Sequence, residues 1–335
     1  MLRTARAFRT ILAALSVAVL LAAGPGTRHV AAEDQIVVNY AAVPLVRGDM
    51  GLLSVGGLVF RGALTLTSAD RRFGGFSALH VSANGEALLA VSDHGDWLAA
   101  RLHYDHRLWL AALTEGRMGR LLALDGKALS EAARERDAES MTVRRDASTV
   151  ITFERHHRIW SYPASEQPFA KPPRAFVPPP DLGQAPSNEG LEAFAELDDG
   201  RFLAISEGLF DAPDRLVGWL GDGTLWQRLY FAVHGSYRPT DAKALPNGDV
   251  LVLERKFHMI GGFGARLRRI PKAEIAPGAT LRGEALAELE APMMVDNFEG
   301  LAVRRGERET LVYLISDDNF LSVQSTILML FAIPD

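Results

Sequence analysis

Carboxylates recur at the ends of five apolar segments, and their spacing suggests a shared chemistry. The acids that end these segments are Asp93, Glu154, Glu207, Glu254 and Asp317. Acids also stand near the start of most of these units, namely Glu139, Glu192 with Glu189 before it, Asp241 and Glu299. If the fold gathers equivalent positions, several negative charges meet at one place. Such a group needs a cation or basic partners, because buried carboxylates repel one another and otherwise take up protons.

A metal ion is the first cation to consider. Oxygen ligands in this number favour Ca²⁺ over softer metals. The residues that we predict to hold one or more ions are Asp93, Glu139, Glu189, Glu207, Glu254, Glu299, Asp317 and Asp318. Any one of these acids is also explained by solvation at a strand end, or by a cap to a neighbouring strand. Asp318 in particular could instead stabilise a turn. It is the repetition of the position that favours a functional acidic site.

Basic residues close to these acids are candidates for substrate binding. We predict this role for Lys243, Arg255 and His94. Arg255 directly follows Glu254, and adjacent strand residues face opposite sides, so the two cannot simply pair. Arg255 could therefore bridge to the next repeat, or bind an anionic group such as phosphate, whose geometry suits a guanidinium.

The elements that must position these residues form a repeat. Each unit is a short strand, a tight turn and a second strand that is apolar on nearly every residue, as in strands buried on both faces. Asn84-Gly85, Asp199-Gly200 and Asn247-Gly248 occupy the turns and indicate hairpins with primed turns. The terminal acids are 61, 53, 47 and 63 residues apart. Periods of about fifty residues with internal hairpins are typical of propeller blades.

The sequence therefore predicts an all-β fold, a β-propeller with six blades. Five repeats are visible, and residues 52–67 with the C-terminal strand at 326–333 would supply the sixth blade and close the ring. Five or seven blades, or a two-sheet β-sandwich, are the alternatives. The proline-rich residues 167–186 resemble a domain linker, but the repeat resumes after them, so we expect one domain over residues 33–335.

The first 32 residues are predicted to be a secretory signal peptide. Arg3, Arg6 and Arg9 precede an apolar run over residues 11–23, and small residues before position 33 offer a cleavage site. This run is shorter than the roughly 20 residues that span a bilayer. An uncleaved anchor is the alternative. We expect an exported, periplasmic or extracellular monomer without a membrane span in its mature form.

Composition and motifs exclude several classes of function. The segment 33–335 has 32 basic and 41 acidic residues and no basic block, which argues against nucleic-acid binding. The chain contains no cysteine, which excludes thiol catalysis, disulfides and lipid attachment through cysteine. No nucleophile elbow, zinc-protease motif or phosphate-binding loop is present.

The chain resembles the phytase-like proteins described as having esterase-like activity. The segments that carry this resemblance are residues 73–79, Asp93-His94-Gly95, 137–140, 188–192, Leu253-Glu254-Arg255, 297–301 and 316–320. The resemblance implies a propeller related in shape to the calcium-dependent phytases, which hydrolyse phosphate monoesters in an acidic channel filled with calcium. It implies no active site that can be transferred residue by residue, and fold alone does not give function.

Three hypotheses follow. The first is a Ca²⁺-dependent hydrolase that acts on a small-molecule ester or phosphoester, in which bound ions polarise the ester and activate water. The second is an exported propeller without enzymatic activity, which binds a ligand or partner and holds a structural cation. The third is a lactonase-like, metal-dependent hydrolase. Metal-dependent turnover distinguishes the second from the others, and phosphate release distinguishes the first from the third.

Overall fold

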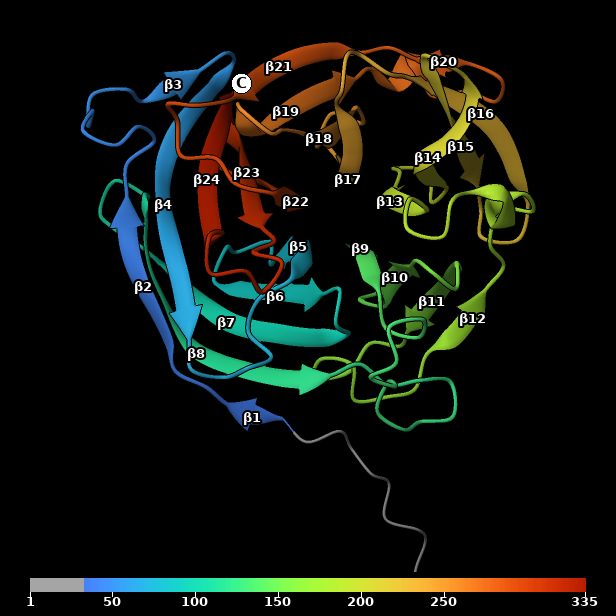
Figure 1. The fold of residues 1–335 in the computed structure, drawn as a ribbon, viewed down its shortest axis with the longest axis horizontal. Helices are drawn as coiled ribbons and strands as arrows, with labels where there is room; N and C mark the ends of the chain where they lie inside the picture. The colour runs from blue at the N-terminus through green and yellow to red at the C-terminus, as the bar shows by residue number, and fades with distance from the viewer. Residues whose placement is uncertain (1–32) are drawn as a thin grey trace, which may run out of the picture.

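A computed structural model of the chain describes residues 33–335, which form an all-β propeller. Five sheets of four to six strands are arranged around a common axis (Figure 1). The predicted fold class is confirmed, but the prediction of six blades is wrong, because the five visible repeats are the five blades. The predicted signal peptide, residues 1–32, lies outside the described residues.

The first three blades each begin at the axis and run outward. Blade 1 contains β5 (Phe76–Val81), β6 (Ala87–Ser92), β7 (Asp96–Tyr104), β8 (Leu110–Arg120) and β1 (Asp34–Gln35). Blade 2 contains β9 (Ala138–Val143), β10 (Thr149–Phe153), β11 (Arg158–Tyr162) and β12 (Arg174–Phe176). Blade 3 contains β13 (Leu191–Glu196), β14 (Phe202–Ala212), β15 (Arg215–Gly221), β16 (Trp226–Ala232) and β20 (Thr280–Leu281).

The last two blades complete the ring. Blade 4 contains β17 (Arg238–Ala244), β18 (Val250–His258), β19 (Gly262–Ile270) and β21 (Glu284–Leu289). Blade 5 contains β22 (Phe298–Arg305), β23 (Glu309–Ser316), β24 (Thr326–Pro334), β4 (Leu58–Ser68), β2 (Val38–Val43) and β3 (Ser54–Val55). Two short 3₁₀ helices, η1 (Leu182–Gln184) and η2 (Lys272–Glu274), lie in the connections of the described chain.

The ring is closed by strands from both ends of the chain within one blade. β4 pairs antiparallel with β24, with Leu64 opposite Leu328. Figure 1 shows this N-terminal strand (blue) beside the C-terminal strands (red). The two segments predicted to form a sixth blade are therefore the outer part of blade 5. Division of the chain length by about fifty overcounts the blades, because edge strands and connections add residues to several of them.

Left-handed residues at the same place in four blades make the innermost hairpins. Gly85, Gly200 and Gly248 have φ of 81°, 84° and 89°, and Ala147 takes this place in blade 2 with φ of 60°. Each donates its N–H to the carbonyl three residues before it. The residue before each glycine does not have positive φ. The predicted hairpins are thus present, but with a longer turn that ends in a left-handed residue instead of a two-residue primed turn.

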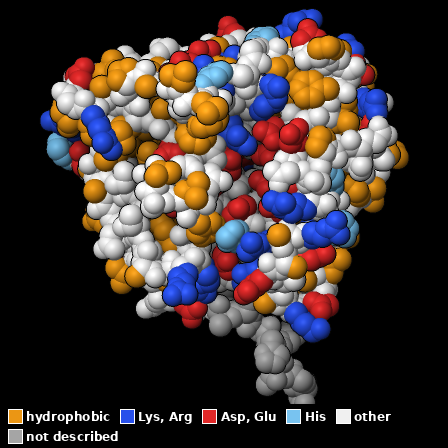
Figure 2. All heavy atoms as spheres, viewed as in Figure 1, with side chains coloured by type: hydrophobic (Ala, Val, Ile, Leu, Met, Phe, Trp, Pro, Cys, Tyr) orange, Lys and Arg blue, Asp and Glu red, His pale blue; other side chains and the backbone are white. Residues whose placement is uncertain are grey.

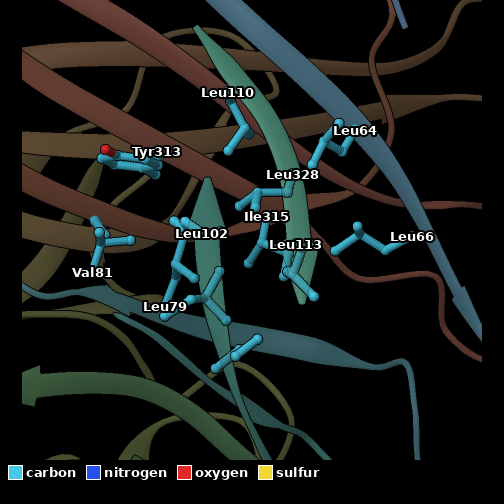
Figure 3. Packing of buried hydrophobic residues seen from close by; sticks show 14 of the residues in the cluster. Leu64, Leu66, Leu79, Val81, Leu102, Leu110, Leu113, Tyr313, Ile315 and Leu328 are labelled. Carbon is cyan, nitrogen blue, oxygen red and sulfur yellow. The ribbon is translucent and has the colours of Figure 1, made fainter. Parts of the chain in front are cut away.

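The core lies between neighbouring sheets. Figure 3 shows one such layer, in which Leu79 and Leu113 of blade 1 pack with Ile315 and Leu328 of blade 5. All four are at most 2% exposed. Burial of this kind on both faces explains the almost continuous apolar sequences of the inner strands. Over residues 33–335, no helix has the length and hydropathy to cross a membrane.

Candidate functional site

A β-bulge occurs at the start of every innermost strand. In each blade one residue is skipped in the pairing between the first and second strands. The skipped residues are Ser77, Glu139, Glu192, Thr240 and Glu299. Bulges change the direction in which a side chain points and are common beside functional sites. Three carboxylates therefore occupy equivalent positions around the axis.

A second ring of charges lies on the second strand of each blade or directly after it. Each of its residues directly follows the pairing partner of the residue before the bulge; these residues are Asp93, Glu154, Glu207, Arg255 and Asp317. Arg255 is the only cation in this ring. Its Nε lies 3.3 Å from Oε1 of Glu299, and its Nη2 lies 3.4 Å from Oε1 of Glu207.

The carboxylates of these two rings, together with Asp137, form one group that we call the acidic cluster. Its members are Asp93, Asp137, Glu139, Glu154, Glu192, Glu207, Glu299 and Asp317. They come from four blades, and electrostatic interactions between blades link them, as between Glu192 and both Glu139 and Glu299. Figure 2 shows acidic side chains (red) in a hollow of the face that is seen along the propeller axis, with Lys and Arg (blue) at its borders.

In blade 4 the acid of the repeat comes one residue earlier, relative to the bulge, than in the other blades. Phe76, Leu191 and Phe298 pair with serines, whereas the equivalent Pro239 pairs with Glu254. Glu254 thus takes the place of a serine and Arg255 takes the place of an acid. A shift of one residue moves a side chain to the opposite face of a strand.

Glu254 consequently lies apart from the acidic cluster. Its two oxygens accept hydrogen bonds from Arg266 at 2.8 Å and from Arg268 at 2.5 and 3.0 Å. Arg268 also lies over the ring of Phe231 in blade 3. The structure therefore places Glu254, a predicted metal ligand, in an ion-pair network within blade 4 that contacts blade 3 through Arg268.

Burial raises the pKa of the carboxylates in the acidic cluster. The pKa of Asp93 is raised to about 7 by burial and then by Glu299. Burial, and then the charges of Glu299 and Asp93, raise the pKa of Asp317 to about 9. Burial also raises the pKa of Glu154 to about 8 and that of Glu207 to about 7, although Arg255 opposes the rise at Glu207. The protein without a cation therefore holds protons in this site at neutral pH.

The donor set suits a hard divalent cation. Carboxylate oxygens of Asp137, Glu139 and Glu154 all lie within 4.8 Å of one another. Oδ1 of Asp93 and Oδ1 of Asn297 are buried and have no hydrogen-bond partner within the described residues. Unpaired buried oxygens are costly, and a bound ion would satisfy them. Oxygen ligands without nitrogen or sulfur fit Ca²⁺.

The acidic cluster lies within a recognisable family region. Residues 71–320 match the model of the phytase-like family described as "Esterase-like activity of phytase". The chain belongs to this family. Every member of the acidic cluster and Arg255 fall inside the matched region, and no curated protein matches the chain.

Two solved structures are similar to this family member at low sequence identity. A gluconolactonase from Xanthomonas campestris is 12% identical, with a TM-score of 0.42, and the alignment covers 82% of this chain and 79% of that one. Virginiamycin B lyase from Staphylococcus aureus is 8% identical, with a TM-score of 0.39, and the alignment covers 88% and 99%. Function must therefore be argued from the site.

Two predicted ligands lie at the border of the acidic cluster. The oxygens of Asp318 accept hydrogen bonds from the N–H groups of Gly75 and Phe320 and from the hydroxyl of Thr326, at 3.0 to 3.1 Å. Asp318 thus holds the turn after β23. Glu189 is exposed and lies against Gly208, which has no space for a Cβ there. Its charge raises the pKa of Glu207.

The three predicted substrate-binding residues separate in space. Arg255 lies within the acidic cluster. His94 lies at its mouth, where its Nε2 is 4.0 Å from Oδ2 of Asp93 and its ring stacks on Phe320 at 4.1 Å. Burial and nearby arginines lower the pKa of His94 to about 4, so it is neutral at pH 7. Lys243 pairs with Asp241 at 2.5 Å and borders a cavity at the opposite end of the propeller.

Three members of the acidic cluster were outside the predicted ligand set. Glu154 and Glu192 are acids of the sequence repeat. Their equivalence to Glu207 and Glu299 is the signal that would have added them to the predicted ligands. Asp137 precedes the bulge of blade 2 and has φ of 27°, and it is ion-paired with Arg155. Its sequence signals are its place two residues before Glu139 and its inclusion in residues 137–140, one of the segments that carry the family resemblance.

Proposed function

We propose that this family member is an exported, Ca²⁺-dependent hydrolase of esters or phosphoesters. The observation that carries the proposal is the gathering of eight carboxylates from four blades around Arg255. So many buried negative charges with so little basic compensation are unfavourable unless a cation binds. In calcium-dependent hydrolysis, the bound ion polarises the ester and lowers the pKa of a water molecule.

The residues of the chain supply the rest of the site. Asp137, Glu139 and Glu154 would hold one ion, and Asp93, Glu299 and Asp317 would hold another on the side of blades 1 and 5. Arg255 would bind an anionic oxygen of the substrate, for which a guanidinium is well shaped. His94, neutral at the mouth, can accept or donate a hydrogen bond without adding charge. Lys243 is left out of this role because it lies at the other end of the propeller.

The proposal includes a location. The predicted signal at residues 1–32 would direct the chain out of the cytoplasm, and the mature protein would start near residue 33 as a single domain. Millimolar calcium outside the cytoplasm would then be enough to occupy sites of modest affinity, since extracellular modules bind Ca²⁺ with dissociation constants of about 10⁻⁴ to 10⁻³ M.

A binding propeller with a structural cation is the second candidate. It is favoured by the fact that the acidic cluster joins four blades, so that an ion there would cross-link the ring even if no reaction occurred. Thermal melting in EDTA and then in added Ca²⁺ tests the ion, with Mg²⁺ as a control. Hydrolysis of p-nitrophenyl phosphate and p-nitrophenyl acetate tests the reaction.

The outcomes separate the candidates. A rise in melting temperature with Ca²⁺ and calcium-dependent turnover would support the hydrolase and identify the ester class. A rise in melting temperature without turnover of either ester would favour the binding propeller. If Ca²⁺ neither raises the melting temperature nor supports turnover, the proposal that the acidic cluster is a cation site is rejected.

A further inference from the structure

In three consecutive blades, an exposed phenylalanine follows the residue of the second ring of charges by two or three positions. Phe210 follows Glu207 in blade 3, Phe257 follows Arg255 in blade 4, and Phe320 follows Asp317 in blade 5. Their exposed fractions are 38%, 56% and 37%. Large apolar side chains that gather on a surface usually mark a contact with a ligand or partner.

Phe257 in blade 4 lies on the same face of its strand as Arg255. The pairing of β18 with β19 is regular from Val250 to His258, so Arg255 and Phe257 point to the same side. Phe257 lies opposite Phe263, and the two ring centroids are 4.9 Å apart. The hairpin continues to Met259 and Ile260, which are 95% and 104% exposed. An apolar wall thus continues directly outward from Arg255.

Of the other two rings, Phe320 lies beside a carboxylate of the acidic cluster, and Phe210 contacts a cross-strand neighbour of Arg255. A Cβ on Gly75 would collide with both the carboxylate of Asp93 and the ring of Phe320, so these two lie against the same glycine. Phe210 lies below the guanidinium of Arg238, at 5.2 Å, and Arg238 is the register partner of Arg255. Figure 2 shows hydrophobic side chains (orange) beside the hollow that contains the acidic ones.

We propose that these rings form an apolar subsite, and that the substrate is an ester with a sizeable alkyl or aryl group. This inference rests on the proposed hydrolase. The reactive group would lie at the acidic cluster and Arg255, while the apolar group would lie across Phe210, Phe257 and Phe320. A compact polyanion would leave this wall in water. It would also find in Arg255 a guanidinium that already pairs with Glu207 and Glu299.

The test combines a neutral binding probe, which does not depend on the calcium site, with ester substrates, whose turnover does. N-phenyl-1-naphthylamine fluoresces on entering an apolar environment, and p-nitrophenyl esters with acyl chains of increasing length report on turnover. The variant is the double substitution Phe257→Ser with Ile260→Ser. The matched control is Leu225→Ser, which removes another exposed apolar side chain (76% exposed) from the opposite end of blade 3.

We expect the wild-type protein to bind the naphthylamine and to prefer the octanoyl over the acetyl ester by about tenfold in kcat/KM. Burial of about two of the additional methylene groups of the octanoyl chain would account for this ratio. The double variant should lose the fluorescence and bring the ratio close to one, while Leu225→Ser changes neither. No binding by the wild type, or a double variant that keeps both properties, would overturn the apolar subsite. If the wild type binds the probe, the double variant loses this binding and no ester is hydrolysed, the apolar subsite is supported and the proposed hydrolase is rejected.

Discussion

Arg255 of blade 4 lies 3.3 Å from Glu299 of blade 5, measured from Nε to Oε1. This ion pair joins two blades at the point where acids outnumber bases most strongly. Burial alone would lower the pKa of Arg255, but the combined attraction of Glu299, Glu207, Glu192 and Glu139 raises it above its usual range. Arg255 therefore acts as a built-in cation of the acidic cluster.

Replacement of Arg255 should destabilise the protein mainly when calcium is absent. We expect Arg255→Gln to lower the free energy of unfolding by about 3 kcal/mol in EDTA, because removal of one partner leaves buried charges uncompensated. Added Ca²⁺ should restore more than half of this loss. Urea unfolding in both conditions measures the effect. The control Arg145→Gln breaks the exposed pair with Asp198 and should cost less than about 1 kcal/mol.

The stability of the calcium-free protein should fall as pH rises. The folded-state pKa values of Asp93, Glu207, Glu154 and Asp317 are raised to about 7, 7, 8 and 9, whereas the unfolded values are near 4. The folded state thus binds more protons, and its advantage is complete below pH 4 and is lost as pH rises through 7 to 9. Melting temperatures in EDTA from pH 5 to 9 should decline.

Calcium should flatten this decline, because a bound cation replaces the protons. The comparison of the two pH series in the same buffers provides the control for all other titrating groups. A melting temperature in EDTA that rises between pH 6 and pH 9 would contradict the proton uptake that burial implies.

Much of the fold could be predicted from the sequence because each blade repeats its inner hairpin. The acids and left-handed turn residues recur at equivalent places, so the repeat is visible without an alignment. The number of blades could not be obtained in this way. β4 and β24 are separated by most of the chain, and nothing local in either strand indicates that they pair.

The acidic cluster was partly predictable. Serine precedes the acid in Ser92-Asp93, Ser206-Glu207 and Ser316-Asp317, whereas Leu253 precedes Glu254. Phe153 precedes Glu154, which does belong to the cluster, so the missing serine alone does not show that Glu254 lies outside it. The place of Lys243 was harder to predict. It lies two residues further along the inner strand than Asp241, and about 6.6 Å of strand carries it away from the acidic end.

Two neighbouring acids should respond differently to the same substitution. Asp317→Asn removes a carboxyl that must take up a proton on folding at pH 8, so it should raise the melting temperature in EDTA at this pH. It also removes an anionic ligand, so it should at least halve the gain from Ca²⁺. Asp318→Asn weakens the three hydrogen bonds that hold the turn after β23, so it should cost about 1–2 kcal/mol with or without calcium. Calorimetry of both variants, with a calcium titration, distinguishes them. Equal calcium responses in the two variants would reject Asp317 as a ligand.

Glu254 provides the strongest contrast between stability and ion binding. Its side chain is fully buried, and both oxygens are held by Arg266 and Arg268. Glu254→Gln would leave two buried guanidinium groups without their shared anion, so we expect a loss of about 3–5 kcal/mol in unfolding free energy. The calcium concentration that gives half of the thermal stabilisation should remain within about twofold of the wild-type value, because Glu254 faces away from the acidic cluster. A calcium response as weak as that of Asp317→Asn would instead place Glu254 among the ligands.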